Sequence, residues 1–398
     1  MSEKENIKIV YEKVESKPPP RGEGGAWGWI KENLFSSKTS IFLTVIAAVL
    51  VINIAAPLLE WSILDATWTG EKQSDCDRKG ACWIFIGEKF YQFIYGFYPR
   101  AIVWRVNLTF IVFPLLLIPF FIKTLPFRFI SLSNIKRERA EIPFKFKFFW
   151  FLFVFFVFPI LGFFFLQGNP YDPCVRLAEK GMCFVPTHKW GGLMITLGLT
   201  FLGIILSFPL GVLAGLGRSS NLKLIHYLSV VYIEFWRGVP LITILFMASV
   251  ALPLFLPPGM EFDKLLRAIF GIVFFQSAYV AEVLRGGLQS IPRGQYEAAD
   301  ALGLNYVKKM TYIVLPQAFK VVLPSFVGIS ISLMQDTTLI LILGLFDMLG
   351  MVSATTADPN WLGFEAEGLV FVGVASWTVC YAMSRYSFYL EEKTKAGN

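Results

Sequence analysis

Polar side chains interrupt two apolar stretches of the chain, and they are the residues best suited to bind a solute. In chain order they are Gln276, Ser277, Tyr279, Glu282, Gln335, Asp336, Thr337 and Thr338. Hydroxyls and amides both donate and accept hydrogen bonds, whereas ionised carboxylates only accept them. Polar groups inside apolar segments mark the paths of substrates or ions. These residues therefore favour binding of a small polar molecule.

The chain lacks the sequence patterns of common catalytic sites. It contains no G-x-x-x-x-G-K-[ST], no H-E-x-x-H and no G-x-S-x-G. Its only histidines are His188 and His226, which leaves little material for acid–base chemistry near neutral pH or for a zinc site. We expect no catalytic residue and no metal site in this chain.

The composition indicates that membrane-spanning helices position the polar residues. Of the 398 residues, 55% are hydrophobic and only 16% are charged, against about a quarter charged in soluble proteins. The net charge of +7 comes from basic residues that flank apolar runs, which indicates membrane topology rather than nucleic-acid binding. Residues 1–40 have no early apolar core, so we expect no cleavable signal peptide.

Eight stretches are long enough to cross a bilayer, which takes about 20 apolar residues. They cover residues 41–61, 104–122, 148–166, 192–216, 228–256, 265–285, 311–345 and 367–388. The fifth and seventh stretches are long and contain prolines, which kink or break helices.

Lysines and arginines orient these spans, because they resist translocation. Segment 123–147 is strongly basic, whereas no Lys or Arg lies between Lys320 and Arg385. The acidic loop after the seventh span is therefore expected outside. Eight crossings with both termini in the cytoplasm satisfy this pattern.

Four cysteines fall in the expected outer loops, Cys76 and Cys82 in the first and Cys174 and Cys183 in the second. On an oxidising face they can form disulfides, and four cysteines allow three pairings. Free thiols in partly buried loops are an equally good interpretation.

Charges and small residues also occur inside the spans. Glu234 and Arg237 are three residues apart, just before Pro240. They are either interfacial anchors beside a proline kink or part of a helix break that lines a polar path. Gly211 and Gly215 form a G-x-x-x-G pattern that favours close helix contact.

The segment "EAADALGLNYVKKMTYIVLP", residues 297–316, follows the sixth span on the cytoplasmic side. Residues 295–302 fit a short helix with Ala298, Ala301 and Leu302 on one side, and Gly303 can close it in a left-handed conformation. The small side chains allow close approach of a second backbone. The segment is either a docking helix or an ordinary interfacial helix.

The spacing E-A-A-x-x-x-G-x9-I-x-L-P is met in full in this segment. The matching residues are Glu297, Ala298, Ala299, Gly303, Ile313, Leu315 and Pro316. This pattern resembles the EAA signature of the membrane subunits of binding-protein-dependent ABC importers. "EFWRGVPLI" (234–242), "SAYVAEVLRGGLQSIPRGQYEAA" (277–299) and "QDTTL" (335–339) further resemble polar amino-acid permeases, with Gln335 where lysine is common. With three extra N-terminal spans, the whole chain is similar to the longer permease subunit of general L-amino-acid transporters.

The resemblance implies a role for the segment and a set of partners. Residues expected to couple to the ATPase are Glu297, Ala298, Ala299, Gly303, Leu315 and Pro316. The implied partners are a second permease subunit, an ABC ATPase dimer and a periplasmic amino-acid-binding protein. ATP and Mg would be bound by the ATPase, and no cofactor by this chain.

The resemblance also implies a path for L-amino acids. The candidate residues are Glu234, Arg237, Ser277, Tyr279, Glu282, Gln335, Asp336 and Thr337. Asp336 can accept hydrogen bonds from the ammonium group of the amino acid, while Ser277, Gln335 or Thr337 can donate hydrogen bonds to its carboxylate. Alternatively, Asp336 caps a helix or forms a bond across a subunit interface.

We therefore expect an all-α polytopic membrane protein, and the resemblance implies that it lies in the bacterial inner membrane as a multi-pass protein. Residues 1–40 and 390–398 would be cytoplasmic tails, 41–189 a three-span extension with two outer loops, and 190–389 a five-span ABC type-1 permease core. Two other functions stay open: an ion-gradient-driven secondary transporter, or a membrane scaffold without transport. A secondary transporter would be expected to show inverted repeats with intramembrane acids in both halves.

Overall fold

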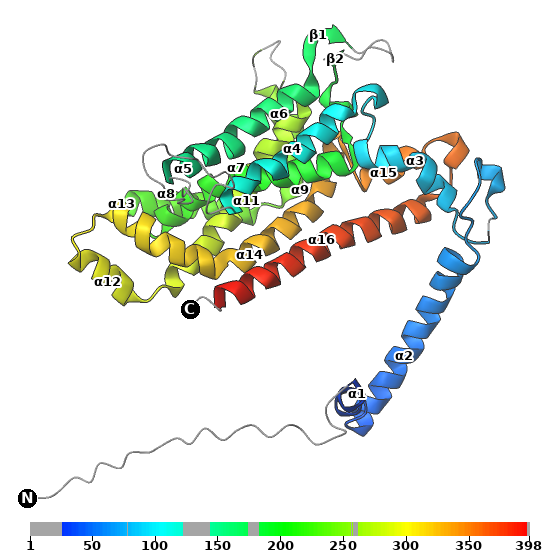
Figure 1. The fold of residues 1–398 in the computed structure, drawn as a ribbon, viewed down its shortest axis with the longest axis horizontal. Helices are drawn as coiled ribbons and strands as arrows, with labels where there is room; N and C mark the ends of the chain where they lie inside the picture. The colour runs from blue at the N-terminus through cyan, green and yellow to red at the C-terminus, as the bar shows by residue number, and fades with distance from the viewer. Residues whose placement is uncertain are drawn as a thin grey trace, which may run out of the picture. The chain divides into compact units, whose positions relative to one another are not determined.

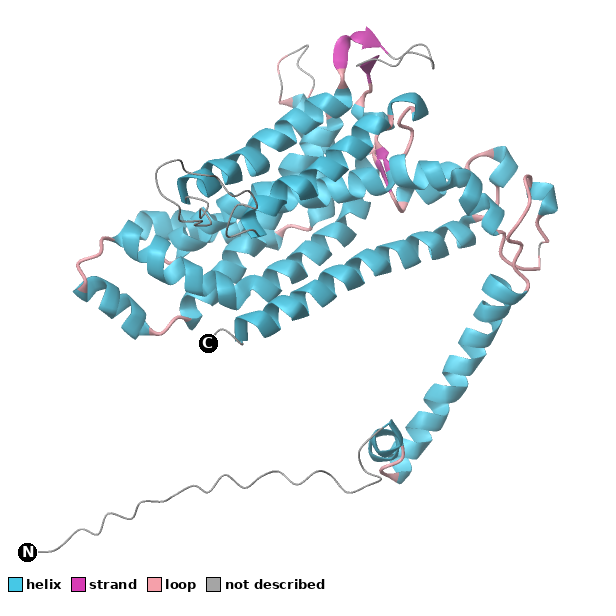
Figure 2. Cartoon of the chain, in the orientation of Figure 1, coloured by secondary structure: helices cyan, strands magenta, loops and turns pink. Residues whose placement is uncertain are grey.

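The computed structural model describes residues 26–77, 79–121, 144–173, 183–255, 257 and 262–395. Helices dominate this part of the chain (Figures 1 and 2). The chain divides into two compact units, Met1–Trp83 and Ile84–Asn398. The all-α prediction is confirmed, apart from short strands near the ends of the spans.

The first unit contains one apolar helix and a small disulfide-closed loop. Helix α1 covers Ala26–Leu34, and α2 covers Lys38–Leu59 and continues into a π-helical turn, Glu60–Leu64. The Ser37 hydroxyl caps α2 by accepting from the amide of Ser40 at 3.1 Å. Beyond the short 3-10 turn Gln73–Asp75, a disulfide joins Cys76 to Cys82.

The second unit begins with elements that precede the predicted five-span core. Helix α3 (Trp83–Tyr95) is followed by the 3-10 turn Arg100–Ile102 and by α4 (Trp104–Phe121). Helices α5 (Phe144–Leu152) and α6 (Phe158–Gln167) are joined by the π-helical turn Phe153–Val157. Strands β1 (Asn169–Pro173) and β2 (Cys183–Phe184) pair in parallel, and the 3-10 turn Thr187–Lys189 follows.

The remaining elements form the five-span part. They are α7 (Gly192–Arg218), α8 (Lys223–Gly238), α9 (Leu241–Phe246), a π-helical turn (Met247–Ala251), α10 (Leu252–Leu254), α11 (Lys264–Ser290), α12 (Arg293–Ala301), α13 (Tyr306–Lys309), a second π-helical turn (Met310–Val314), α14 (Leu315–Asp336), a 3-10 helix (Thr337–Leu343), β3 (Phe346–Asp347), α15 (Gly350–Thr356), a 3-10 turn (Pro359–Trp361) and α16 (Glu365–Lys395).

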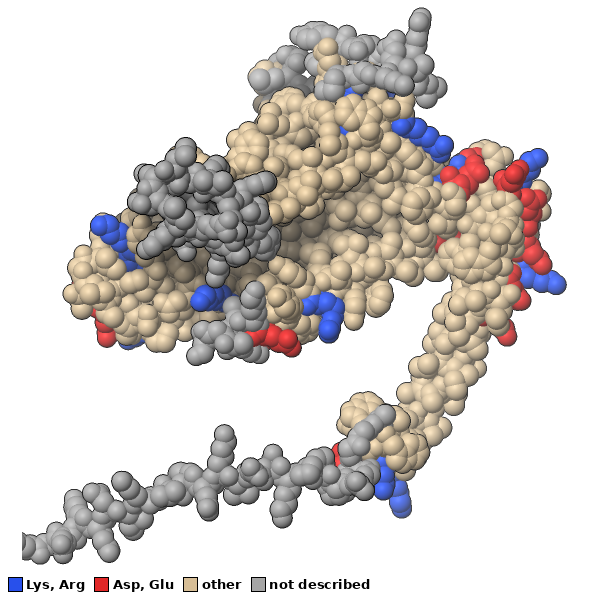
Figure 3. All heavy atoms as spheres, in the orientation of Figure 1, with Lys and Arg blue, Asp and Glu red and all other residues tan. Residues whose placement is uncertain are grey.

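Within the described residues, seven helices are long and apolar enough to cross a membrane. An eighth crossing is complete if the pair Lys223–Gly238 and Leu241–Leu254, which is bent by 95°, counts as one broken span. The bend falls at the fifth predicted span, because Pro240 has no amide hydrogen and disfavours helix in the residue before it. On the face shown in Figure 3, charged side chains gather toward the helix ends and leave the flanks of the second unit largely free of charge.

Close packing of α7 against α11 forms the centre of the second unit. A Cβ atom at Gly211 would lie 2.5 Å from Cβ of Val280, and one at Gly215 would lie 2.9 Å from the carbonyl oxygen of Ala281. Only glycine permits these approaches, so the predicted role of the G-x-x-x-G pattern is confirmed. Helix α14 also packs on α11. A Cβ atom at Gly287 of α11 would lie 2.5 Å from the Val322 side chain of α14.

One end of this unit is held by contacts between distant segments. Backbone bridges join Gly96 to Trp190 and Gly192 to Asp347. The Asp347 carboxylate accepts from the amide of Gly350, the first residue of α15, at 2.8 Å, while burial raises the pKa of this carboxyl. Lys89 of α3 pairs with Asp358 at 2.7 Å. Elements before residue 190 are thus part of the same packed unit as the five spans.

Candidate functional site

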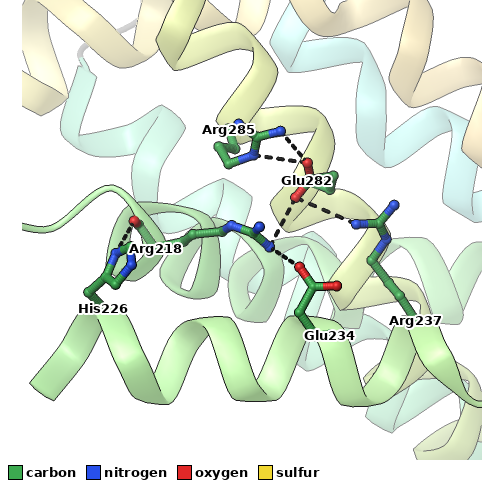
Figure 4. A network of polar contacts seen from close by, with 6 residues as sticks. All are labelled: Arg218, His226, Glu234, Arg237, Glu282 and Arg285. Carbon is green, nitrogen blue, oxygen red and sulfur yellow. Dashed lines mark hydrogen bonds and ion pairs between the residues drawn. The ribbon is translucent and has the colours of Figure 1, made fainter.

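Five charged side chains from three helices form a network in the second unit (Figure 4). Arg218 ends α7, Glu234 and Arg237 belong to α8, and Glu282 and Arg285 belong to α11. Glu282 lies at the centre. It accepts two hydrogen bonds from Arg285, and it lies 3.4 Å from Nη1 of Arg218 and 3.7 Å from Nη1 of Arg237.

Local structure explains why Arg218 reaches this network. A Cβ atom at Gly217 would lie 2.1 Å from the Ser229 hydroxyl, so the end of α7 is pressed against α8. Nδ1 of His226 lies 2.7 Å from the carbonyl oxygen of Arg218 and ties down the turn between the helices. From there Nη1 of Arg218 donates to Glu234 at 2.7 Å.

The network carries one positive charge in excess, because three guanidinium groups face two carboxylates. Glu282 has 22% of its side chain exposed, whereas Glu234 has 55%. Arg237 also lies over the ring of Tyr279, with 5.6 Å between its guanidinium carbon and the ring centroid. A cation on an aromatic face is held without being neutralised. The surplus charge can therefore attract an anionic group.

The network adds two residues to the sequence candidates. The ion pairs of the described residues join Glu234 to Arg218 and Arg237 to Glu282, so Glu234 and Arg237 pair with other helices rather than with each other. Arg285 was missed, although its spacing of three residues from Glu282 is readable in the sequence. Nothing local in the sequence identifies Arg218 as a partner.

Ser277 lies on α11 in a different bonding environment. It is fully buried, its hydroxyl donates to the carbonyl of Phe274 at 2.7 Å, and Tyr232 lies 2.5 Å from the same oxygen. Its single hydrogen is therefore used inside the protein. Next to it, the ring of Trp236 on α8 stacks on the ring of Phe274 on α11, with centroids 5.2 Å apart.

Gln335, Asp336 and Thr337 lie where α14 changes into a 3-10 helix. Thr337 is fully buried and donates to the carbonyl of Met334 at 2.7 Å. Gln335 is exposed and Asp336 is half-buried. Asp336 makes no side-chain capping bond to the 3-10 helix that follows it, so the helix-cap alternative is wrong. No hydrogen bond or ion pair found among the described residues connects this group with the network around Glu282.

The candidate coupling segment forms two short helices, α12 and α13, at the opposite end of the second unit from α15 (Figure 1). Glu297 and Ala298 are exposed, and Leu302 is 76% exposed. Gly303 has φ of +71°, which confirms the predicted left-handed cap. Asn305 then caps α13 by accepting from the amide of Lys308 at 3.0 Å.

Contacts behind the exposed face fix this segment to the long helices. Ala299 is fully buried. The Tyr296 hydroxyl donates to the carbonyl of Leu288 on α11 at 3.2 Å, and Lys309 pairs with Asp300 at 2.6 Å. An apolar cluster continues the contact with α11 and α14, formed by Leu284, Leu288, Ile291, Met310, Val314 and Ala318.

The cysteines are placed in part. Cys76 and Cys82 form a disulfide, and Cys183 is also disulfide-bonded. Cys174 lies outside the described residues, and Cys380 is a free thiol. Among the residues that the structure describes, no group of three or more His, Cys, Asp or Glu side chains could hold a metal ion.

Comparison with known proteins places the chain in a family. Residues 207–396 match the model of the binding-protein-dependent transport system inner membrane component. The chain is 42% identical over 383 residues to the inner membrane amino-acid ABC transporter permease protein YhdY of Escherichia coli strain K12, covering 96% of each. It is 36% identical over 428 residues to the glutamate/glutamine/aspartate/asparagine transport system permease protein BztC of Rhodobacter capsulatus, covering 97% of this chain and 98% of that one.

A solved structure, the crystal structure of an amino acid ABC transporter with histidines, is 26% identical to this chain. It covers 50% of this chain and 91% of its own, with a TM-score of 0.45. The chain therefore belongs to the ABC transporter permeases that are the inner membrane components of binding-protein-dependent transport systems.

Proposed function

We propose that this chain forms one half of the path by which an ABC importer moves L-amino acids into the cytoplasm. The exposed, small-faced helix α12, closed by Gly303 and fixed to α11, is the observation that carries the proposal. The named substrates of the two full-length relatives support the amino-acid class. Both termini are placed in the cytoplasm by the basic segments of the sequence.

The coupling contact is assigned to the exposed face of α12. Glu297, Ala298, Ala301 and Leu302 point away from the bundle and are available to a partner. Ala299 is buried and Leu315 is half-buried, and both hold the segment in place. Gly303 ends α12 in a left-handed conformation, and Pro316 lies in the first turn of α14. The partner is a cytoplasmic ATPase dimer, which binds ATP and Mg; this chain binds no cofactor.

Movement of α12 would reach the path through α11. The two helices are separated only by the turn at Ile291 and Pro292, and the same apolar cluster joins them to α14. Helix α11 also carries Glu282. A displacement imposed on α12 is therefore transmitted to the charge network, because a helix moves as a stiff element.

The substrate contacts are assigned to the groups that remain available. Asp336 is half-buried in the seventh span, and no hydrogen bond or ion pair is found for it among the described residues, which suits an acceptor for the ammonium group. The Ser277 and Thr337 hydroxyls already donate within the protein. Gln335 and the surplus charge at Arg237 are left to bind the carboxylate. Tyr279 and Glu282 position Arg237, while Glu234 holds Arg218 in the same network.

The remaining parts of the proposal follow the family's architecture. A second permease subunit completes the path, and a periplasmic amino-acid-binding protein delivers the substrate. Residues 190–389 act as the permease core and 41–189 as an extension. Closure of the ATPase dimer on ATP turns the cavity outward, and hydrolysis returns it to the cytoplasmic side.

Uptake of labelled acidic, neutral and basic L-amino acids in cells tests the proposal. The full system should accumulate substrate, whereas the chain expressed without the ATPase should not. Glu297→Lys should abolish uptake and ATPase co-purification while the protein still reaches the membrane, because the new charge is unpaired in the partner's groove. Accumulation driven by an ion gradient without any ATPase would support the secondary transporter instead.

A further inference from the structure

An apolar cavity of about 390 Å³ lies among the spans of the second unit. None of the polar path candidates lines it, although Met334, next to Gln335, does. Its walls come mainly from α4, α6 and α7. Three bulky rings close one part of it: the ring of Phe113 lies 3.8 Å from that of Phe201 and 6.0 Å from that of Phe158 between centroids.

Sequence features of the helices explain why the cavity exists. Pro114 interrupts α4, and Pro159 starts α6 directly after a π-helical turn, so neither helix packs as a straight rod along α7. Gly162 of α6 and Gly198 of α7 both line the cavity and contribute no side chain to it. A Cβ atom on Gly198 would meet nothing within 4 Å, so there is open space beside it.

The chemistry of the walls excludes a polar ligand. Only Thr109, Thr200 and Trp190 bring a polar side-chain atom to the lining. The two threonine hydroxyls donate to the carbonyls of Arg105 and Thr196, at 2.8 and 2.7 Å, and the indole nitrogen donates to the carbonyl of Val185 at 3.3 Å. These side chains keep no free donor for water or an amino acid, and the rest of the lining is apolar, so the site favours hydrocarbon.

The dimensions match one layer of lipid tails. Along α7 the lining extends from Met194 near the start of the helix to Ile204. At about 1.5 Å per residue this is about 15 Å, half of the roughly 30 Å hydrocarbon core of a bilayer. All three wall-forming helices belong to membrane-spanning segments. The material available at this depth is acyl chain.

We propose that this cavity binds one acyl chain of a membrane phospholipid, with the chain lying along α7 between α4 and α6. The bound chain fills the space left by the glycines and prolines and joins the extension spans to the core. Interiors are packed without voids because empty space loses dispersion contacts. The site would therefore hold a lipid that is retained when the surrounding lipids are removed.

The full-length chain in vesicles of phosphatidylethanolamine and phosphatidylglycerol tests this. A trace of phosphatidylcholine with a diazirine at the middle of one acyl chain is added, the sample is irradiated, and lipid adducts are mapped by mass spectrometry. Adducts are expected on the α7 peptide that contains Gly198. In Gly198→Trp, where the new ring occupies the cavity, they should fall by about tenfold, equivalent to about 1.4 kcal/mol in binding free energy.

Gly373→Trp on α16 is the matched control, because Gly373 is exposed and a Cβ there also meets nothing within 4 Å. Its α7 adducts should equal those of the unchanged protein. Gly162→Leu adds a side chain to the α6 wall of the cavity and provides the same test if Gly198→Trp fails to reach the membrane. Adducts that persist at full level in both filling variants would overturn the proposal.

Discussion

At the scale of single residues, Glu282 is the carboxylate on which the charge network depends. It faces Arg218, Arg237 and Arg285, whereas Glu234 has only Arg218 among the ion pairs of the described residues. Charged groups that are partly withdrawn from water gain more from a partner than exposed ones do. The two glutamates should therefore differ in their contributions to stability and transport.

Replacing Glu282 by Gln should lower the free energy of unfolding by about 1.5–3 kcal/mol, the range for loss of hydrogen bonds to a charged group. Uptake should fall with it, because Arg237 and Arg285 lose their shared carboxylate. Glu234→Gln, at a side chain that is 55% exposed, should cost no more than about 1 kcal/mol. Thermal unfolding of the purified protein measures both, and equal losses would contradict the central role of Glu282.

A second residue-scale prediction concerns pH. The hydrogen bond from Lys89 holds the pKa of Asp358 below its ordinary value. Because the folded-state pKa is the lower one, the pair stabilises the fold above the ordinary Asp pKa of about 3.9, and this contribution is lost as the pH falls through the folded-state value. The difference in melting temperature between the unchanged protein and Asp358→Asn should be constant near neutral pH and shrink below about pH 4. A difference that grows on acidification would contradict the assignment.

At the scale of elements, the exit of α12 depends on one backbone conformation. Gly303 has φ of +71°, and a left-handed conformation costs other residues about 1–2 kcal/mol. A Cβ atom would meet nothing within 4 Å at either Gly303 or Gly294, which lies in the first turn of α12 with a negative φ. Gly303→Ala should therefore reduce uptake through backbone strain alone, while Gly294→Ala should preserve it. Uptake assays at matched membrane levels distinguish the two, and equal activity would remove the strain argument.

The contact between α7 and α11 gives a second prediction at this scale. At Gly211 an added Cβ would lie 2.5 Å from Val280 and 2.7 Å from the carbonyl of Ser277, so the helices must separate. Gly211→Val should destabilise the second unit by about 1–3 kcal/mol or more, as overpacking does. Gly286→Ala is the control on α11, because that position has open space. An unchanged melting temperature in Gly211→Val would show that the helices are not packed this closely.

At the scale of the whole molecule, the proposed function requires that the coupling segment and the α15 end lie on opposite faces of the membrane. Leu302 beside α12 is 76% exposed, and Leu362 before α16 is 67% exposed. A membrane-impermeant maleimide applied to intact cells should label Leu362→Cys but not Leu302→Cys. Leu302→Cys should react only after permeabilisation. The reverse pattern would place α12 outside the cell, where no ATPase could reach it.

Local patterns in the sequence were enough to predict the spans and the short helix that ends at Gly303. Apolar length marked the crossings, Pro240 marked the break, and Gly303 marked the end of α12, because each depends on residues within a few positions. The ion-pair partners could not be predicted in the same way. Arg218 meets Glu282 only because Gly217 lets the end of α7 lie against α8, which is a property of packing rather than of spacing.

The sequence by itself determined that this is an all-α membrane protein, which stretches cross the bilayer, and that it carries the EAA pattern of ABC importer permeases. Only the tertiary structure decided that the Ser277 and Thr337 hydroxyls are already used, that Glu282 serves three arginines, and that α4, α6 and α7 enclose an apolar cavity. Helix periodicity and turn chemistry act over a few residues and are therefore readable from the sequence. The rotation and separation of helices arise from side chains far apart along the chain, and they are fixed only when the helices pack.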